Sequence, residues 1–180
     1  MANLIVLAVH GAPPNDFPPA EMAEFSALHA RIEHGDPSAV PEPLRRRAAQ
    51  LEARLRDWPR HAGNDPFWAA SHELGAHLGS LTGCDVLVGF NEFCAPGLDE
   101  VLEMAAARGS GVTVVTPMLT RGGSHAEQDI PTAIGRARAA HPDVSFAYAW
   151  PYDMAEVARF LAARVAACDG RQDRTEAPGT

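Results

Sequence analysis

The chain has 180 residues, 46% of them hydrophobic, and a formal net charge of −8, which predicts one globular domain with its own core. The acidic charge disfavours nucleic acid as a partner, because nucleic-acid-binding proteins normally present a basic face. No apolar run is long enough to cross a bilayer, and the first residues lack the basic start of a signal peptide, so we expect a cytoplasmic protein without a membrane partner.

Four apolar or β-branched runs are expected to form strands, at residues 4–9, 85–90, 111–116 and 143–149. Helical periodicity predicts helices at residues 20–33, 43–58, 67–81, 97–108, 129–140 and 153–168. Strands that alternate with helices of this length predict right-handed βαβ units, hence an α/β fold with a four-stranded parallel sheet and helices on both faces. The continuous β-branched run at 112–116 predicts a strand that is buried on both faces.

The segment between the first two strands contains three expected helices, whereas a βαβ crossover needs only one. We therefore expect residues 12–65 to form a helical insertion in a single domain of residues 1–168, followed by a flexible tail at 169–180. The helix at 67–81 is expected to turn one stripe of side chains inward, namely Trp68, His72, Leu74 and Leu78.

Three expected strands are followed by residues of the types that commonly bind metals, histidine and glutamate. His10 follows the first strand, Glu92 follows the second, and His125 lies in a turn beyond the third. In open α/β sheets the carboxyl ends of the strands border the ligand-binding crevice, so we expect these three side chains to converge there. Each also has a structural alternative: a strand-end histidine in the core, a surface salt bridge, or helix initiation by a capping box of Ser124 and Glu127.

Two imidazoles and one carboxylate form a donor set that suits Fe²⁺, Co²⁺, Ni²⁺ or Zn²⁺ and leaves positions open for a substrate. Asp129 stands four residues after His125, where we expect its carboxylate either to orient that imidazole or to cap the next helix. Cys94 lies close to Glu92, but the three cysteines lack metal-site spacing, so we expect Cys94 to be buried.

Several motifs occur in order along the chain: His10-Gly11, then Phe90-Asn91-Glu92-Phe93 with Pro96, then Pro117-Met118-Leu119 through Gly122 and His125 to Asp129-Ile130-Pro131. In this combination, over residues 1–11 and about 66–168, the chain resembles the small sirohydrochlorin chelatase family of the CbiX and SirB type. The resemblance implies a chelatase-like fold and a lyase that inserts Co²⁺, Fe²⁺ or Ni²⁺, as substrate, into a tetrapyrrole of cobalamin or siroheme biosynthesis. It implies no organic cofactor, and it gives His10, Glu92 and His125 the metal-binding and catalytic roles.

For such a substrate we expect Pro13 and Phe17 to form an apolar lip against the macrocycle and Arg121 to bind its carboxylates. The run Arg45–Arg47 is a weaker candidate for the same role, since it also fits a solvated helix face. We expect either a homodimer or the inserted helices to supply the second wall of the cleft.

Two other functions fit the same residues. A non-catalytic metal or tetrapyrrole carrier would use the same ligands, and it is slightly favoured by the Ala12-Pro13-Pro14 sequence after His10-Gly11, where small family members usually have a serine and a nearby basic residue. A metal-dependent hydrolase is the weakest alternative, because no phosphate-binding loop or second-metal carboxylate cluster is evident.

Overall fold

The structure is a computed structural model that describes residues 4–33 and 40–172. In this part of the chain the strands β1 (Leu4–Val9), β2 (Asp85–Phe90), β3 (Gly111–Val115) and β4 (Ser145–Tyr148) form one parallel sheet in the order β2-β1-β3-β4. Every residue of the central strand β1 is buried, as its unbroken apolar sequence requires. The predicted four-stranded parallel sheet is confirmed.

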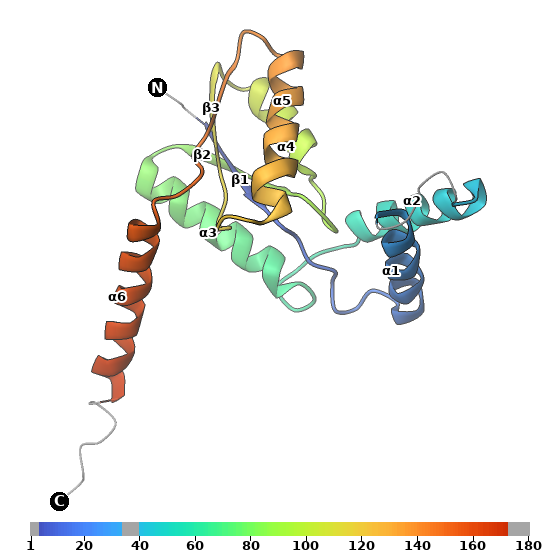
Figure 1. The fold of residues 1–180 in the computed structure, drawn as a ribbon, viewed down its shortest axis with the longest axis horizontal. Helices are drawn as coiled ribbons and strands as arrows, with labels where there is room; N and C mark the ends of the chain where they lie inside the picture. The colour runs from blue at the N-terminus through green and yellow to red at the C-terminus, as the bar shows by residue number, and fades with distance from the viewer. Residues whose placement is uncertain (1–3, 34–39, 173–180) are drawn as a thin grey trace, which may run out of the picture.

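The helices are α1 (Pro19–Glu33), α2 (Glu42–Arg56), α3 (Pro66–Thr82), α4 (Leu98–Ala106), α5 (Ile130–Ala140) and α6 (Met154–Gln172), and a π-helical turn at His125–Asp129 precedes α5. Helix α3 packs against β1 and β2 on one face of the sheet, while α4 and α5 cover the other face (Figure 1). The main core therefore lies between β1, β3 and the helices α4 and α5; Val6, Val114, Leu102 and Ile134 are all at most 1% exposed. None of the helices in the described residues is long and apolar enough to span a bilayer.

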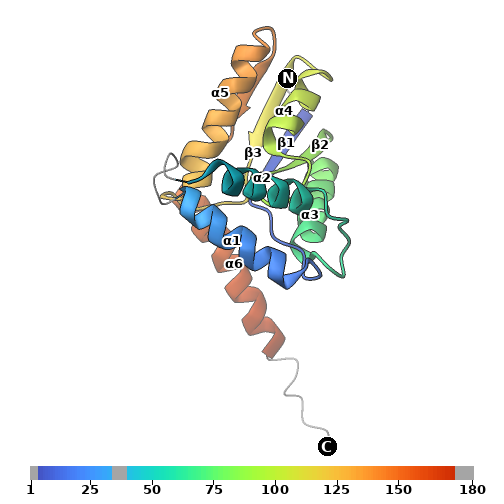
Figure 2. The same ribbon diagram turned by 90° about the vertical axis from the view of Figure 1, so that its right-hand side faces the viewer.

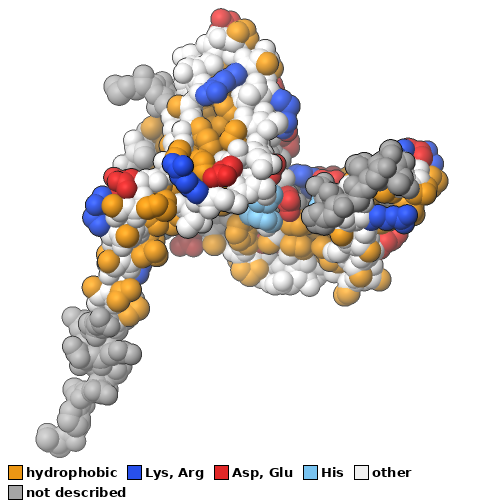
Figure 3. All heavy atoms as spheres, viewed as in Figure 1, with side chains coloured by type: hydrophobic (Ala, Val, Ile, Leu, Met, Phe, Trp, Pro, Cys, Tyr) orange, Lys and Arg blue, Asp and Glu red, His pale blue; other side chains and the backbone are white. Residues whose placement is uncertain are grey.

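The prediction that the third strand is buried on both faces is wrong. Along β3 the side chains alternate, with Val112 and Val114 buried towards α4 and α5, but Thr113 and Val115 only half-buried. The second face is incompletely covered because α6 borders it only through its first turns, at Val157 and Phe160, and then projects away from the body of the molecule (Figures 1 and 2). The space-filling view shows hydrophobic side chains along α6 open to the surroundings (Figure 3).

The predicted inward stripe of α3 is wrong at Leu74. The small residues Ser71 and Gly75 face the sheet and let α3 approach β2 closely, whereas Leu74 is 43% exposed. Trp68 and His72 are partly buried, and their rings contact each other with centroids 4.5 Å apart. Leu74 instead lies beside the part of the sheet that α6 leaves uncovered.

Helices α1 and α2 stand beside the carboxyl edge of the sheet (Figure 2), between β1 and α3 in sequence. They share a hydrophobic cluster of their own, built from Phe17, Phe25, Leu51 and Leu55. At the other end of the chain, α6 continues to Gln172, so the first residues of the predicted flexible tail are helical. The rest of that tail lies outside the described residues.

Candidate metal centre

Gly11 turns the chain sharply, directly after His10. Its φ is +106°, in the left-handed region, and a Cβ at this position would lie 2.0 Å from the carbonyl oxygen of Glu92. Only glycine therefore lets the loop after β1 pass this close to the loop after β2. This close approach brings the backbones that carry His10 and Glu92 into contact.

Backbone hydrogen bonds continue the pairing of β1 with β2 past the strand ends. The N–H of Asn91 donates to the carbonyl of Val9 at 2.9 Å, and the N–H of Glu92 donates to that of His10 at 2.8 Å. The register of the sheet thus extends into both loops. As a result, the sheet brings the backbones of His10 and Glu92 side by side.

His10, Glu92 and His125 form a cluster that we call the ligand triad. One ligand atom from each residue lies within 4.8 Å of the other two. The Nε2 atoms of His10 and His125 lie 4.0 and 3.7 Å from the carboxylate oxygens of Glu92. Ligand atoms around a tetrahedral ion lie roughly 3.4 Å apart, given bonds of about 2.0–2.2 Å, so small side-chain rotations would close the triad around one ion.

Both imidazoles turn the same nitrogen towards Glu92. Nδ1 of His10 lies 2.8 Å from the carbonyl oxygen of Gly11, and Nδ1 of His125 lies 2.6 Å from a carboxylate oxygen of Asp129. Because both of these partners are acceptors, each Nδ1 carries the proton and donates it, which leaves both Nε2 lone pairs free for an ion. The triad therefore has the tautomers that a metal site requires.

The turn that carries His125 lacks the capping box of Ser124 and Glu127, which was the structural alternative for this residue. Ser124 already has helical φ and ψ, −54° and −44°, because the π-helical turn starts at the next residue, and its side chain caps nothing. A capping residue needs an extended backbone, so the alternative of helix initiation by this capping box is excluded. Glu127 instead accepts a hydrogen bond from the N–H of Gly122, and Asp129 bonds His125 and makes no cap hydrogen bond to α5.

Cys94 is fully buried in the cluster that includes Val88 and Phe90. Burial raises the pKa of its thiol to about 11, an effect that the charge of Arg60 partly opposes. A thiol with such a pKa stays protonated near neutral pH and is a poor metal ligand. The predicted buried position of Cys94 is confirmed.

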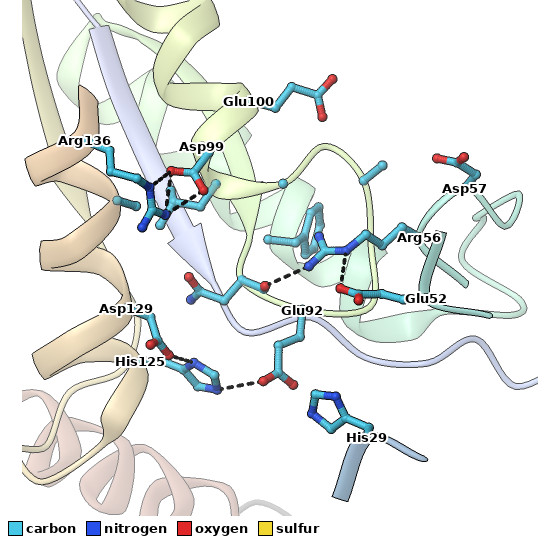
Figure 4. Close-up of a pocket in the computed structure, with 16 residues that line it drawn as sticks. His29, Glu52, Arg56, Asp57, Glu92, Asp99, Glu100, His125, Asp129 and Arg136 are labelled. Atoms are coloured by element: carbon cyan, nitrogen blue, oxygen red, sulfur yellow. Dashed lines mark hydrogen bonds and ion pairs between the residues drawn. The ribbon is translucent and has the colours of Figure 1, made fainter. Parts of the chain in front are cut away.

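A cleft of about 570 Å³ opens beside the triad. Figure 4 shows Glu92, His125 and Asp129 at one end of it, with His29 of α1 facing Glu92 from the insertion. The lining contains the carboxylates of Glu52, Asp57, Glu92, Asp99, Glu100 and Asp129 and the guanidiniums of Arg56 and Arg136. Because carboxylates outnumber guanidiniums, the electrostatic field of the cleft favours cations.

The other residues predicted to contact a substrate lie in different surroundings. Arg121 is exposed and makes no ion pair with any residue that the structure describes, and Pro13 is half-buried in the loop after His10. The prediction for Phe17 is wrong: its side chain is 4% exposed and packs on Trp58 inside the insertion, with ring centroids 5.0 Å apart. The run Arg45–Arg47 forms surface ion pairs within the insertion.

Three residues near the site escaped the sequence interpretation. Arg56 donates a hydrogen bond to the carbonyl of Asn91, next to Glu92, and Arg60 donates to the carbonyl of Phe93 on its other side. His29 lies on α1, where the helical spacing marked only the apolar residues. No local motif marks any of the three, because each meets the site only through the packing of the insertion on the sheet.

The fold and the triad together define an α/β protein with a candidate transition-metal site at the carboxyl edge of its parallel sheet. The model of the CbiX family matches residues 65–168, which is more than half of the chain. The chain therefore belongs to the CbiX family, and the resemblance inferred from its motifs is confirmed. The matched region includes Glu92 and His125, whereas His10 and the insertion precede it.

The similar solved structures are distant in sequence. A putative cobalamin biosynthesis CbiX protein from Marinobacter aquaeolei VT8 is 19% identical, with a TM-score of 0.50, over 95% of this chain and 98% of that one. The sirohydrochlorin chelatase SirB from Bacillus subtilis subspecies spizizenii in complex with cobalt is 19% identical, with a TM-score of 0.41, over 84% of this chain and 44% of SirB. SirB from Bacillus subtilis with Fe³⁺ has the same identity and TM-score, over 84% and 40%.

This chain thus spans less than half the length of the SirB chains, but nearly all of the Marinobacter protein. At 19% identity and a TM-score of 0.50, the likeness to the Marinobacter protein shows the fold alone. A comparison with functionally curated proteins finds no match.

Proposed function

We propose that this protein inserts a divalent metal ion, taken up as a substrate, into a tetrapyrrole. The observation that carries the proposal is the convergence of His10, Glu92 and His125 within 4.8 Å in a member of the CbiX family. Two imidazoles and a carboxylate suit Co²⁺, Fe²⁺ or Ni²⁺ and leave coordination positions open for a macrocycle. We place the reaction in the cytoplasm, where cysteines without paired spacing stay reduced.

The insertion of a metal ion requires a base, because the pyrrole N–H protons must leave the macrocycle as the ion enters. The Nε2 atoms of His10 and His125 are suited to this step. One imidazole accepts the two pyrrole protons in turn and releases each to water, while the other, together with Glu92, holds the incoming ion. Asp129 accepts the Nδ1 proton of His125 and so favours the imidazolium that proton transfer to that ring would produce.

Arg121 is the residue that we assign to the carboxylates of the macrocycle. Its guanidinium is exposed and has no ion-pair partner in the described part of the chain, and it precedes His125 by four residues. By contrast, Arg56 and Arg136 of the cleft already pair with Glu52 and Asp99, at 3.1 and 2.7 Å. Pro13 is the residue of the predicted apolar lip that stays accessible, next to the loop of His10.

We further propose that the protein works as a homodimer. An apolar groove of about 490 Å³ runs along the uncovered face of the sheet, and its lining includes Leu74, Leu78, Val115 and Leu119. In α6, Phe160, Leu161 and Val165 are 57%, 52% and 62% exposed. A two-fold exchange in which each α6 packs into the groove of the other copy would bury both apolar surfaces at once.

Turnover distinguishes an enzyme from a carrier that uses the same ligands. Purified protein is mixed with Co²⁺ and an excess of sirohydrochlorin, and the absorbance change of the macrocycle is followed against the slow spontaneous reaction. We expect many macrocycles to be metallated per protein molecule, and we expect His125→Ala to abolish this. A change that stops at one macrocycle per protein would favour the carrier, and no change beyond the spontaneous rate would refute both.

A further inference from the structure

Arg60, in the loop between α2 and α3, is a buried cation that joins three segments of the chain. Its side chain is 4% exposed and pairs with Asp65, whose side chain is 1% exposed. Nη1 also donates to the carbonyl of Ala12 at 2.7 Å, while Nη2 donates to the carbonyls of Leu55, at 2.8 Å, and of Phe93. One guanidinium thus connects the end of α2, the loop after β1 and the loop after β2.

Two of these segments carry His10 and Glu92, two of the three members of the ligand triad. Ala12 lies two residues after His10, and Phe93 directly follows Glu92. Phe93 has a φ of +60°, a left-handed conformation that residues other than glycine seldom adopt, and the hydrogen bond from Arg60 fixes its carbonyl. The ring of Phe93 also stacks on the imidazole of His10, with centroids 6.0 Å apart and planes inclined by 23°.

Arg56, at the end of α2, holds the same loop at two further points. Its Nη2 donates to the carbonyl of Asn91 at 3.2 Å, and its own carbonyl accepts from the N–H of Ala95 at 3.1 Å. Together, Arg56 and Arg60 fix the backbone on both sides of Glu92. The insertion is therefore hydrogen-bonded to the loop that carries a predicted metal ligand.

We propose that Arg60 is a positioning residue, through which the helical insertion holds His10 and Glu92 at the spacing that a metal ion needs. The inference rests on the proposed metal site. Arginine suits the role because its planar fork offers five donors and reaches several carbonyls at once, whereas lysine offers one compact ammonium. Arg60 lies before residues 65–168, the region matched by the family model, so the residue that supports the two ligand loops comes from the insertion of this chain.

The test compares Arg60→Lys with Arg47→Lys. Arg47 bonds Glu24 through two nitrogens, at 3.0 and 2.7 Å, and so joins α1 to α2 without contacting either ligand loop. Lysine at position 60 keeps the charge opposite Asp65 but loses the fork. We expect Arg60→Lys to lower the affinity for Co²⁺ by about 10–100-fold, as changes around metal ligands commonly do, and to alter the visible absorption bands of bound Co²⁺. Arg47→Lys should change neither.

A second variant keeps the test decisive if Arg60→Lys does not fold. The double variant Arg60→Gln with Asp65→Asn removes both charges together, leaves no unpaired buried ion, and keeps an amide oxygen to cap α3. It should fold and show the same loss of affinity and the same altered bands.

If either folded variant shows the Co²⁺ affinity and absorption bands of Arg47→Lys, the role of Arg60 is refuted while the proposed metal site stands. Unfolding of both variants would also refute the role of Arg60. Absence of Co²⁺ binding by the unsubstituted protein would overturn the proposed metal site together with this inference.

Discussion

The carboxylate of Asp129 lies 2.6 Å from Nδ1 of His125, one turn further along the chain. This contact fixes the tautomer of His125 and orients its ring towards Glu92. We therefore expect Asp129→Ala to lower Co²⁺ affinity by about 10–100-fold without unfolding the protein, since changes of this kind commonly weaken metal sites to that extent. Titration against a coloured chelator measures the affinity. Glu127→Gln, in the same turn, is the control and should bind Co²⁺ normally.

Removal of a triad ligand separates a functional role from a structural one. His125 lies in the turn before α5, and its side chain remains 18% exposed. We expect His125→Ala to abolish Co²⁺ binding yet leave the protein folded, at a cost of about 0.5–3 kcal/mol for truncating this mostly buried side chain. Chemical denaturation monitored by circular dichroism gives that free energy. Unfolding of the variant would show instead that His125 serves the fold.

The close contact of Gly11 with Glu92 predicts a strong effect of a single methyl group. In Gly11→Ala the new Cβ would lie 2.0 Å from the carbonyl oxygen of Glu92 at a φ of +106°, so the two loops must separate. We expect a loss of stability of at least about 2 kcal/mol and a loss of Co²⁺ binding.

Gly122 provides the matched control for that substitution. Its φ is +92°, but a Cβ there would meet no atom within 4 Å. Gly122→Ala should therefore cost only about 1–2 kcal/mol of backbone strain and keep Co²⁺ binding. Equal effects of the two substitutions on metal binding would contradict the proposed role of the contact between the loops.

The sequence allowed the sheet and the convergence of the triad to be predicted, for one physical reason. Parallel strands place their carboxyl ends at one edge, so His10, Glu92 and His125 were expected at that edge, whereas the pairing of β1 with β2 became known only from the structure. Arg60 could not be found in this way, since its importance comes from carbonyls of Ala12 and Phe93 that are distant in sequence. Its own surroundings, between α2 and α3, resemble an ordinary polar loop.

The position of α6 relative to the sheet also could not be predicted from the sequence. An apolar stripe has the same spacing whether a helix packs on its own sheet or on another molecule, so periodicity predicted the helix but not its partner. The errors at β3 and at Leu74 of α3 have this common origin, because both lie on the face that α6 leaves open.

His72 predicts a pH dependence of stability. Its Nε2 is buried without a hydrogen-bond partner among the described residues, and burial lowers its pKa from the ordinary value of 6.5. As the pH falls below about 6.5, the unfolded chain takes up a proton before the folded one, so stability declines towards the lower folded pKa; above 6.5 the residue has no effect. Comparison of melting temperatures between pH 7.5 and 5 should show a smaller decline for His72→Leu. The decline should persist in His77→Leu, because His77 is 73% exposed on the same helix.

The exposed stripe of α6 gives the last prediction. Phe160 is 57% exposed and lines the apolar groove with Leu74 and Leu78, so an aspartate in its place would put a charge inside the proposed interface between two copies. Light scattering coupled to gel filtration should show the unsubstituted protein at about twice its chain mass of 19.2 kDa, and Phe160→Asp at the chain mass.

Ala166→Asp is the matched control, because at 3.6 residues per turn it lies on the side of α6 opposite to Val157, another residue of the groove. It adds the same charge and should leave the dimer intact. Dissociation by both substitutions would point to a general effect on α6, and a monomeric unsubstituted protein at every concentration would refute the exchange. In that case the groove and the stripe of α6 would need a different partner, since each exposes apolar surface that a soluble domain normally buries.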